Sequence, residues 1–348
     1  MSYFSRMPIA DHASQTASRK IRLGYVALVD CAPLVVAQET GIFQRHQINV
    51  RLSRELGWAS VRDRIYQGEL DAAQSITGIA FALGLGVAGL RRSVAVPMIL
   101  NLHGNAITLS TKIDPAHVTR TKFKSYLAAQ AKRDRPLTLA ATHRYSSHHI
   151  LLLQWLRMHQ LSCPEDVDII FLPPPLMTSH LKAGQIDGYC VGEPWNSEAI
   201  LSGAGWCAAT SSELSYHHPE KALLVSDRFL EEYREQTISL VSALLEACTL
   251  CQSPAFRKEL IEILSLPHYT GASREVLANS LGPVFEGGTR SIRNDDFHIF
   301  AGDGVNSPSV EKASWTLSNL RNAKVMPETP GMSLSRIYRE DLFHAASA

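Results

Sequence analysis

The segment Tyr145–His148 combines residue types that could hold a small anion. Serine is a preferred N-cap, so Ser146 and Ser147 predict the start of a helix, whose first turn offers free backbone N–H groups and the positive end of its dipole. His148 lies in that first turn, where its ring can donate a hydrogen bond to a ligand. A surface histidine beside His149 is the alternative interpretation.

A second candidate segment is Val191–Trp195. Gly192 allows the backbone to approach a ligand closely, and Pro194 can occupy the first position of a helix. Glu193 stands between them, at the end of the preceding predicted strand. The same residues would also suit an ordinary strand-to-helix turn.

Three further side chains complete a set that is rich in hydrogen-bond donors. Lys221 precedes the apolar run Ala222–Val225, so its ammonium would lie at the edge of a buried strand, although an exposed lysine is the usual case. Asn105 offers a side-chain amide, and Trp58 is either a core anchor or a flat wall for a planar ligand. Such a set suits a small anion, which a helix N-terminus also binds.

Composition and motifs argue against several other functions. The 34 basic and 33 acidic residues leave a net charge of +1, so no global field favours nucleic acid or an anionic membrane. The adjacent pairs His148-His149 and His217-His218 lack the i, i+4 spacing of a helical zinc site, and neither a GxSxG motif nor a P-loop is present. We therefore expect a binding protein with no metal, no cofactor and no direct nucleic-acid contact.

Two similar segments indicate two similar lobes. Gln67–Ala73 and Ala183–Tyr189 each predict a helix that ends at glycine, a tight turn and a strand that opens with Asp. An apolar strand, a helix and a second strand precede both copies, which is typical of parallel α/β units. A protein with two such lobes usually binds its ligand in the cleft between them.

The domain organisation follows from where this alternation of strands and helices stops. We expect a disordered N-terminus over residues 1–20, a first lobe made of 21–110 and 222–345, and a second lobe over 111–221. The tail after residue 227 reads mainly as helices with a Gly/Pro/Asn-rich loop over 282–308 and has no strand–helix alternation of its own, so we expect it to pack on the first lobe. The chain would then cross between the lobes twice, which makes a hinge.

These segments resemble the nitrate- and bicarbonate-binding proteins of ABC uptake systems. The resemblance rests on Gly24–Leu34, Trp58–Asp63, Leu100–Ser110 and Val191–Asn196, which occur in order between about Ile21 and Val225. It implies a type II periplasmic-binding-protein fold, in which two α/β lobes are joined by a hinge crossed twice and a planar oxyanion lies in the cleft.

The resemblance also implies the residues that line the anion, which here are Trp58, Asn105, His148, Gly192 and Lys221, with Glu193 beside them. Trp58 and Asn105 would come from one lobe, His148 and Gly192 from the other, and Lys221 would neutralise the charge. His103 replaces a usual Asn, and Asn105 stands where nitrate-type members often have Gln. Nitrate, nitrite and bicarbonate therefore all stay open, with nitrate or nitrite expected first.

The first 20 residues lack the hydrophobic core of a secretory signal, so we expect a cytoplasmic protein without membrane insertion. In lacking such a signal it is similar to a cytoplasmic sensor branch of the family. This resemblance implies that the bound anion controls binding to a partner protein, an RNA-binding antiterminator of the ANTAR type. The alternative is the solute-binding component of an ABC importer for nitrate, nitrite or bicarbonate. A third hypothesis is an enzyme, because related folds include a pyrimidine-precursor synthase of thiamine biosynthesis.

Overall fold

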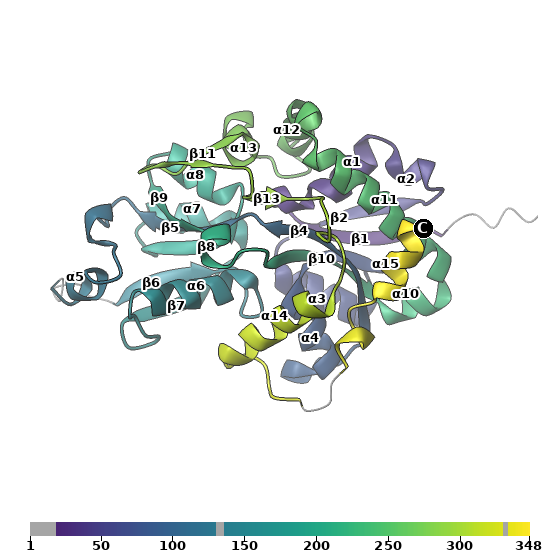
Figure 1. The fold of residues 1–348 in the computed structure, drawn as a ribbon, viewed down its shortest axis with the longest axis horizontal. Coiled ribbons are helices and arrows are strands. Elements are labelled where there is room, and N and C mark those ends of the chain that lie inside the picture. The colour runs from purple at the N-terminus through teal and green to yellow at the C-terminus, as the bar shows by residue number, and fades with distance from the viewer. Residues whose placement is uncertain (1–18, 130–135, 330–332) are drawn as a thin grey trace, which may run out of the picture.

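The computed structural model describes residues 19–129, 136–329 and 333–348, which form two lobes with one mixed β-sheet each (Figure 1). The segment predicted to be disordered, residues 1–20, lies outside the described residues except for Arg19 and Lys20.

The first lobe is built on a six-stranded sheet in the order β13-β4-β10-β3-β1-β2. Strand β1 pairs in parallel with β2 and β3, whereas β10 runs antiparallel to β3 and β4. The bounds are β1 Ile21–Val26, β2 Val50–Glu55, β3 Ala72–Ile76, β4 Val94–His103, β10 Pro219–Ser226 and β13 His298–Ile299.

The second lobe has a five-stranded sheet in the order β7-β6-β8-β5-β9. Strand β6 pairs in parallel with β7 and β8, and β5 runs antiparallel to β8 and β9. Each sheet thus contains a parallel trio beside an antiparallel strand, which confirms the predicted pair of α/β units. The bounds are β5 Asn105–Ser110, β6 Leu137–Ala141, β7 Val167–Phe171, β8 Gly188–Gly192 and β9 Gly205–Thr210, with a separate hairpin of β11 Val284–Glu286 and β12 Ser291–Arg293.

The repeated turn has the same geometry in both lobes. Gly68 and Gly184 have φ angles of +75° and +70°, in the left-handed region that favours glycine. Asp71 and Asp187 then accept a hydrogen bond from the backbone N–H of the second residue of β1 and of β6, at 2.9 and 2.8 Å. The Asp of each copy therefore ties the start of one strand to the start of its neighbour.

Helices cover the sheets, and α1, α11 and α12 pack together on the first lobe while α6 and α8 pack on the second (Figure 1). Most are capped as their sequences require; for example, the Ser146 hydroxyl accepts the His149 N–H at the start of α6. The bounds are α1 Ala32–Glu39, α2 Ile42–Arg45, α3 Trp58–Gln67, α4 Thr77–Leu85, α5 Phe123–Ala129, α6 Ser147–Met158, α7 Met177–Lys182, α8 Trp195–Leu201, α9 Ser211–Leu214, α10 Asp227–Glu232, α11 Arg234–Gln252, α12 Arg257–Ser265, α13 Arg274–Leu281, α14 Val310–Asn322 and α15 Glu340–Ser347.

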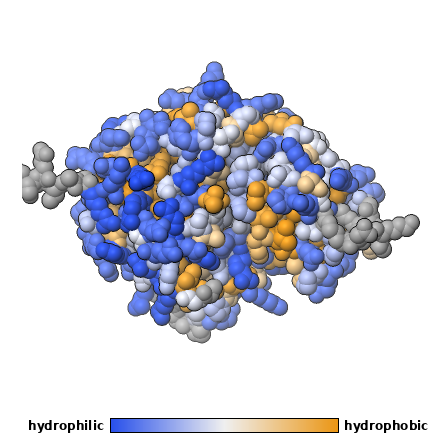
Figure 2. Space-filling model, turned by 180° about the vertical axis from the view of Figure 1, so that it is seen from behind, coloured by the Kyte–Doolittle hydropathy of each residue, from blue (hydrophilic) through white to orange (hydrophobic). Residues whose placement is uncertain are grey.

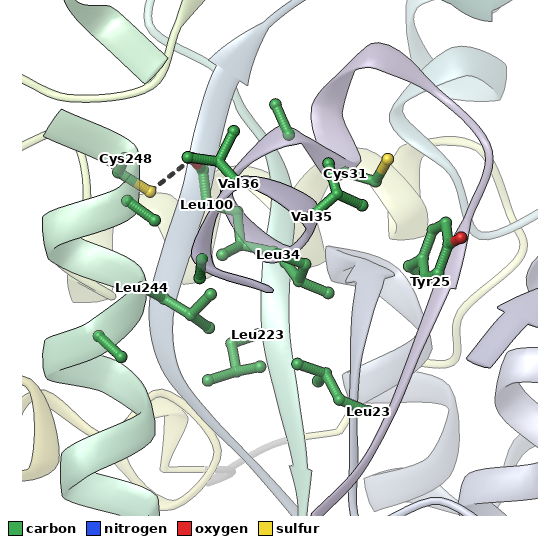
Figure 3. Packing of buried hydrophobic residues seen from close by; sticks show 14 of the residues in the cluster. Leu23, Tyr25, Cys31, Leu34, Val35, Val36, Leu100, Leu223, Leu244 and Cys248 are labelled. Carbon is green, nitrogen blue, oxygen red and sulfur yellow. Dashed lines mark hydrogen bonds between the residues drawn. The ribbon is translucent and has the colours of Figure 1, made fainter. Parts of the chain in front are cut away.

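The core of the first lobe lies between its sheet and these helices. Figure 3 shows Leu34 of α1, Leu223 of β10 and Leu244 of α11 pointing toward one another, and all three are fully buried. The Cys248 thiol donates a hydrogen bond to the Leu100 carbonyl at 3.5 Å, and Cys251 is also a buried free thiol. Burial of this apolar surface is the main stabilising contribution to the lobe.

Two of the connections between the lobes lead directly into a β-strand. The first is Gly104, the single residue between β4 and β5, with a φ of +92°. The second leads from α9 into β10. The expected boundary at residue 110 lies at the end of β5, so the chain leaves the first sheet about six residues earlier than the sequence indicates. The reason is that 94–110 is one extended, fully buried stretch interrupted only by Gly104.

The C-terminal part adds contacts to both lobes. Helices α10 to α12 belong to the first lobe, whereas α13 packs against α8 of the second lobe and β13 returns to pair with β4. In the described residues, no single helix has the length and hydropathy of a membrane span; the bent pair Arg234–Gln252 and Pro254–Ser265 passes that test only when its two helices are joined. The back face is mainly hydrophilic, with scattered hydrophobic groups and one larger cluster (Figure 2).

Candidate functional site

Lys221 lies at the centre of a buried polar cluster between the lobes. It stands on β10 with its side chain fully buried, and its ammonium lies 2.8 Å from the Asp30 carboxylate and within hydrogen-bond reach of Glu220. Asp30 belongs to the short 3₁₀ helix Val29–Cys31, which follows β1. Its other carboxylate oxygen accepts a hydrogen bond from the Gln74 amide on β3. The carboxyl end of the parallel trio of the first sheet therefore supplies an acid and an amide.

Glu220 links this cluster to the second lobe. Its Oε2 accepts a hydrogen bond from the Asn105 amide at 2.6 Å and another from the Ser147 hydroxyl at the start of α6. Asn105 is the first residue of β5 and belongs to the second sheet. It therefore belongs to the lobe opposite to that of Trp58, which corrects the expectation that both residues come from the same lobe.

His148 is fully buried in the first turn of α6. Its Nδ1 lies 2.6 Å from the Thr142 hydroxyl, and its Nε2 lies 3.4 Å from Glu220 Oε1 with no hydrogen-bond partner among the described residues. Burial lowers the pKa of His148 to about 3, so the ring is neutral. When the Thr142 hydroxyl donates to Nδ1, the proton of the ring sits on Nε2, which is then a buried donor.

Trp58 and Gly192 bound the cluster on two sides. The Lys221 ammonium lies 5.2 Å from the centre of the Trp58 ring, and within the described ranges the Trp58 indole N–H has no hydrogen-bond partner. A Cβ atom on Gly192 would stand 3.2 Å from the Asn105 Oδ1 and 3.4 Å from an Asp30 oxygen. A side chain at this position would therefore press against polar groups of both lobes, which only a glycine avoids.

Glu193 is the one predicted site residue whose side chain turns away from this cluster. Its carboxylate accepts hydrogen bonds from the Ser197 backbone N–H of α8 at 3.2 Å and from the Ser280 hydroxyl of α13. Its backbone carbonyl accepts the Val29 N–H at 2.8 Å, which joins the two lobes directly. Glu193 is therefore placed to hold the lobes together rather than to contact a ligand with its carboxylate.

The charges of the cluster are unequal. Burial would lower the pKa of Lys221, but Asp30 and Glu220 outweigh it and raise that pKa. Burial would raise the pKa of Glu220, but chiefly Lys221 lowers it to about 2. For Asp30 burial prevails over the Lys221 charge and raises the pKa to about 6. One ammonium thus faces two carboxyl groups at neutral pH.

Asp30 and Glu220 were missed as site residues by sequence reasoning, which counted donors only. A signal for each was present, since a lone acid inside an apolar run is costly unless it is paired. Asp30 is the single charged residue between Tyr25 and Leu34, and Glu220 directly precedes Lys221 and its apolar strand.

A mixed α/β molecule with two lobes and a buried polar cluster between them has the type II periplasmic-binding-protein fold. The crystal structure of the periplasmic nitrate-binding protein NrtA from Synechocystis has this fold and superposes with a TM-score of 0.89, at 24% identity over 95% of this chain and 89% of that one. The desulfurization enzyme DSZB also shares the fold, with a TM-score of 0.61 at 12% identity over 94% of this chain and 99% of that one. The fold is thus used mainly by binding proteins but also by an enzyme.

The chain belongs to the NMT1-like family, whose model matches residues 14–265. It is 36% identical to the nitrate import ATP-binding protein NrtC of Synechocystis, over 93% of this chain and 49% of that protein. It is 39% identical to the bicarbonate transport ATP-binding protein CmpC of Synechocystis, over 90% and 47%. The nitrate/nitrite binding protein NrtA of Synechococcus elongatus is 28% identical, over 94% and 77%.

The chain spans about half the length of the ATP-binding relatives that it matches. What it shares with all of these proteins is the solute-binding domain of the nitrate and bicarbonate transporter type.

Proposed function

We propose that this domain binds a planar, singly charged oxyanion in the cleft, with nitrate, nitrite and bicarbonate as the candidates. The observation that carries the proposal is the convergence of unshared N–H groups from both lobes around one ammonium. The Trp58 indole N–H and the His148 Nε2 are both buried and lack hydrogen-bond partners within the part of the chain described, and Lys221 lies between the two lobes. Buried donors of this kind are costly unless a ligand accepts from them. The domain acts as a binding protein and not as an enzyme in this proposal.

Closure of the lobes would follow from the bridging of the anion. Trp58 and Lys221 belong to the first sheet and its helices, whereas His148 and Asn105 belong to the second. An oxyanion that contacts both sets stabilises only the closed arrangement, so binding shifts the population toward it.

Calorimetry with nitrate, nitrite and bicarbonate tests this proposal. Wild-type protein should bind at least one of them, and Lys221→Ala should lose that binding because the only ammonium of the cluster is gone. Lys182→Ala, at an exposed position on α7, is the control and should bind like wild type. Unchanged binding by Lys221→Ala would remove this cluster from consideration.

The relatives and the two acids bear on which anion is bound. NrtA and NrtC are named for nitrate and CmpC for bicarbonate, and their identities to this chain do not separate the two. Bicarbonate carries an O–H that can donate to a carboxylate, whereas nitrate and nitrite carry only acceptors. Glu220 and Asp30 therefore favour bicarbonate while both are ionised, and nitrate or nitrite once Asp30 is protonated.

The second candidate function is a cytoplasmic sensor that binds nitrate or nitrite and controls an antiterminator of the ANTAR type. It is supported by the higher identity to ATP-binding proteins, 36% and 39%, than to the nitrate/nitrite binding protein, 28%. ATP-binding subunits work where ATP is present, so a domain of that type would meet the anion inside the cell. As a solute-binding component of an importer, the domain would instead meet it outside.

Size-exclusion chromatography with an ANTAR-type antiterminator from the same genome tests the sensor role. The two proteins should co-elute without nitrate and separate when nitrate is added. Lys221→Ala should co-elute in both conditions. Failure to co-elute under any condition, together with normal oxyanion binding, would leave the importer role and reject the sensor role.

A further inference from the structure

A pocket that is distinct from the polar cluster lies between tail helices of the two lobes. Residues from the end of α11, the start of α12, α13 and the segment that leads into β13 line a cavity of about 320 Å³. This volume is at the lower end of the range of small-molecule sites, which begins at about 300 Å³. The pocket is therefore large enough for a metabolite of amino-acid size.

Two polar side chains that line this pocket have unused hydrogen-bonding atoms. His298 is only 8% exposed, and neither of its ring nitrogens has a partner among the described residues. Asn294 donates from its amide to the carbonyls of Ser280 at 3.0 Å and Gly282 at 2.7 Å, and its Oδ1 is buried without a partner in the described part of the chain. Unsatisfied buried groups of this kind indicate a ligand that supplies the missing partners.

Opposite charges stand at the same pocket. Arg257 lines it from the first turn of α12, and no ion pair within the described residues includes this guanidinium. Asp295 also lines the pocket and pairs with Arg293 at 2.7 Å, and both of these side chains are largely exposed. A guanidinium selects a carboxylate, while Asp295 and the Asn294 oxygen both accept hydrogen bonds from a cationic N–H group.

We propose that this pocket binds a small free amino acid. Its carboxylate would meet Arg257, its ammonium would meet Asp295 and the Asn294 Oδ1, and its side chain would lie near His298. Burial lowers the pKa of His298 to about 3, so its neutral ring offers one N–H donor and one acceptor, which suits an amide or hydroxyl side chain. A simple anion would leave the acceptors unsatisfied, and a simple amine would leave Arg257 unsatisfied.

The pocket is connected to the hinge and to the oxyanion cluster. A Cβ atom on Gly104, the residue between β4 and β5, would come within 2.4 Å of the His298 ring, so this ring packs directly on the hinge backbone. On the other side, Ser280 of the pocket donates to the Glu193 carboxylate, and the Glu193 carbonyl accepts the Val29 N–H across the cleft. An amino acid that orders these side chains therefore changes the affinity for the oxyanion, and by linkage the oxyanion changes the affinity for the amino acid.

The experiment is a thermal-shift screen of the full chain with single L-amino acids at millimolar concentration, followed by calorimetry on those that raise the Tm. Glutarate, which has only carboxylates, and putrescine, which has only amines, serve as control ligands. At least one amino acid should bind, and neither glutarate nor putrescine should. Arg257→Gln should weaken that binding about 10- to 100-fold, the effect of losing a charge-assisted hydrogen bond. Lys258→Gln, the exposed neighbour outside the pocket lining, should leave it unchanged.

His298→Phe gives a second variant, since phenylalanine keeps the stacking on Phe300 and removes both nitrogens. It should also weaken amino-acid binding while the protein keeps a cooperative unfolding transition. No Tm increase with any amino acid, or equal binding by wild type and Arg257→Gln, would overturn the proposal. Amino-acid binding with an unchanged Kd for the oxyanion would overturn the coupling alone. If the protein bound an amino acid but no oxyanion, the proposed function would be rejected and the amino-acid site in this pocket would still be supported.

Discussion

The Asp30 carboxylate lies 2.8 Å from the Lys221 ammonium, and both side chains are at least 99% buried. An oxyanion bound here, as proposed, would meet an excess of negative charge, because the Lys221 ammonium already contacts both Asp30 and Glu220. Removal of one negative charge on binding would solve it. Asp30 is the group able to do so near neutral pH, since burial raises its pKa to about 6, whereas that of Glu220 is lowered to about 2.

Nitrate should accordingly bind more tightly as the pH falls. An anion placed beside Asp30 disfavours its ionised form, so the pKa of Asp30 rises further in the complex and binding takes up a proton. The Kd should decrease as the pH falls from about 8 toward 6 and level off below the pKa of free Asp30, about 6. Calorimetry with nitrate, which does not titrate in this range, in buffers of different ionisation enthalpy measures the proton uptake.

Asp30→Asn should bind nitrate with little pH dependence, because the titrating group is gone. Asp303→Asn, at an exposed position remote from the cluster in sequence, should keep the dependence of the wild type. A Kd for wild type that is flat between pH 6 and 8 would contradict this assignment.

Lys221→Met should destabilise the protein strongly even without ligand. It removes the charge that compensates two buried carboxylates while keeping a similar side-chain volume, and breaking a buried ion pair in this way costs about 3–5 kcal/mol. The double variant Lys221→Met/Glu220→Gln should recover part of this loss, since one uncompensated charge is then removed as well. Urea denaturation measures both, with exposed Lys182→Met as a control expected within about 0.5 kcal/mol of wild type. Equal stability of the single variant and the wild type would show that this ion pair does not contribute to the free energy of unfolding.

The sequence predicted the parallel units of both lobes, because strands such as Leu137–Ala141 are short apolar runs bounded by turn signals. It also indicated several of the segments that meet at the cluster, since Trp58 and His148 lie in the first turns of helices and Gly192 ends a strand. That the site residues contact the ligand stays a prediction.

Other features depended on tertiary context. The lobe of Asn105 could not be read from a continuous apolar stretch in which only Gly104 marks the change of sheet. The direction of the Glu193 side chain is decided by Ser280, which is 87 residues away in sequence.

Glu220→Gln should change the affinities for nitrate and bicarbonate in opposite directions. The amide removes a negative charge beside the anion, so nitrate should bind about tenfold more tightly, equivalent to about 1.4 kcal/mol. Bicarbonate should bind more weakly, because an ionised acceptor for its O–H becomes a neutral one. The two titrations are done at pH 8, where bicarbonate is the main carbonate species. A change of the same sign for both anions would show that Glu220 does not distinguish them by hydrogen bonding.

Gly192→Ala should reduce oxyanion affinity while leaving the fold intact. The backbone of Gly192 lies outside the left-handed region, so alanine is allowed, but its Cβ would stand 3.2 Å from Asn105 Oδ1 and 3.4 Å from an Asp30 oxygen, in contact with both lobes. The methyl group therefore fills space beside the cluster and hinders closure. We expect the Kd for the oxyanion to be about tenfold higher and the free energy of unfolding to change by less than about 1.5 kcal/mol. Gly57→Ala is the matched control, since its Cβ would meet only Pro173 at 3.9 Å. Calorimetry and urea denaturation on both variants separate the two effects, and an unchanged Kd for Gly192→Ala would place the anion away from this glycine.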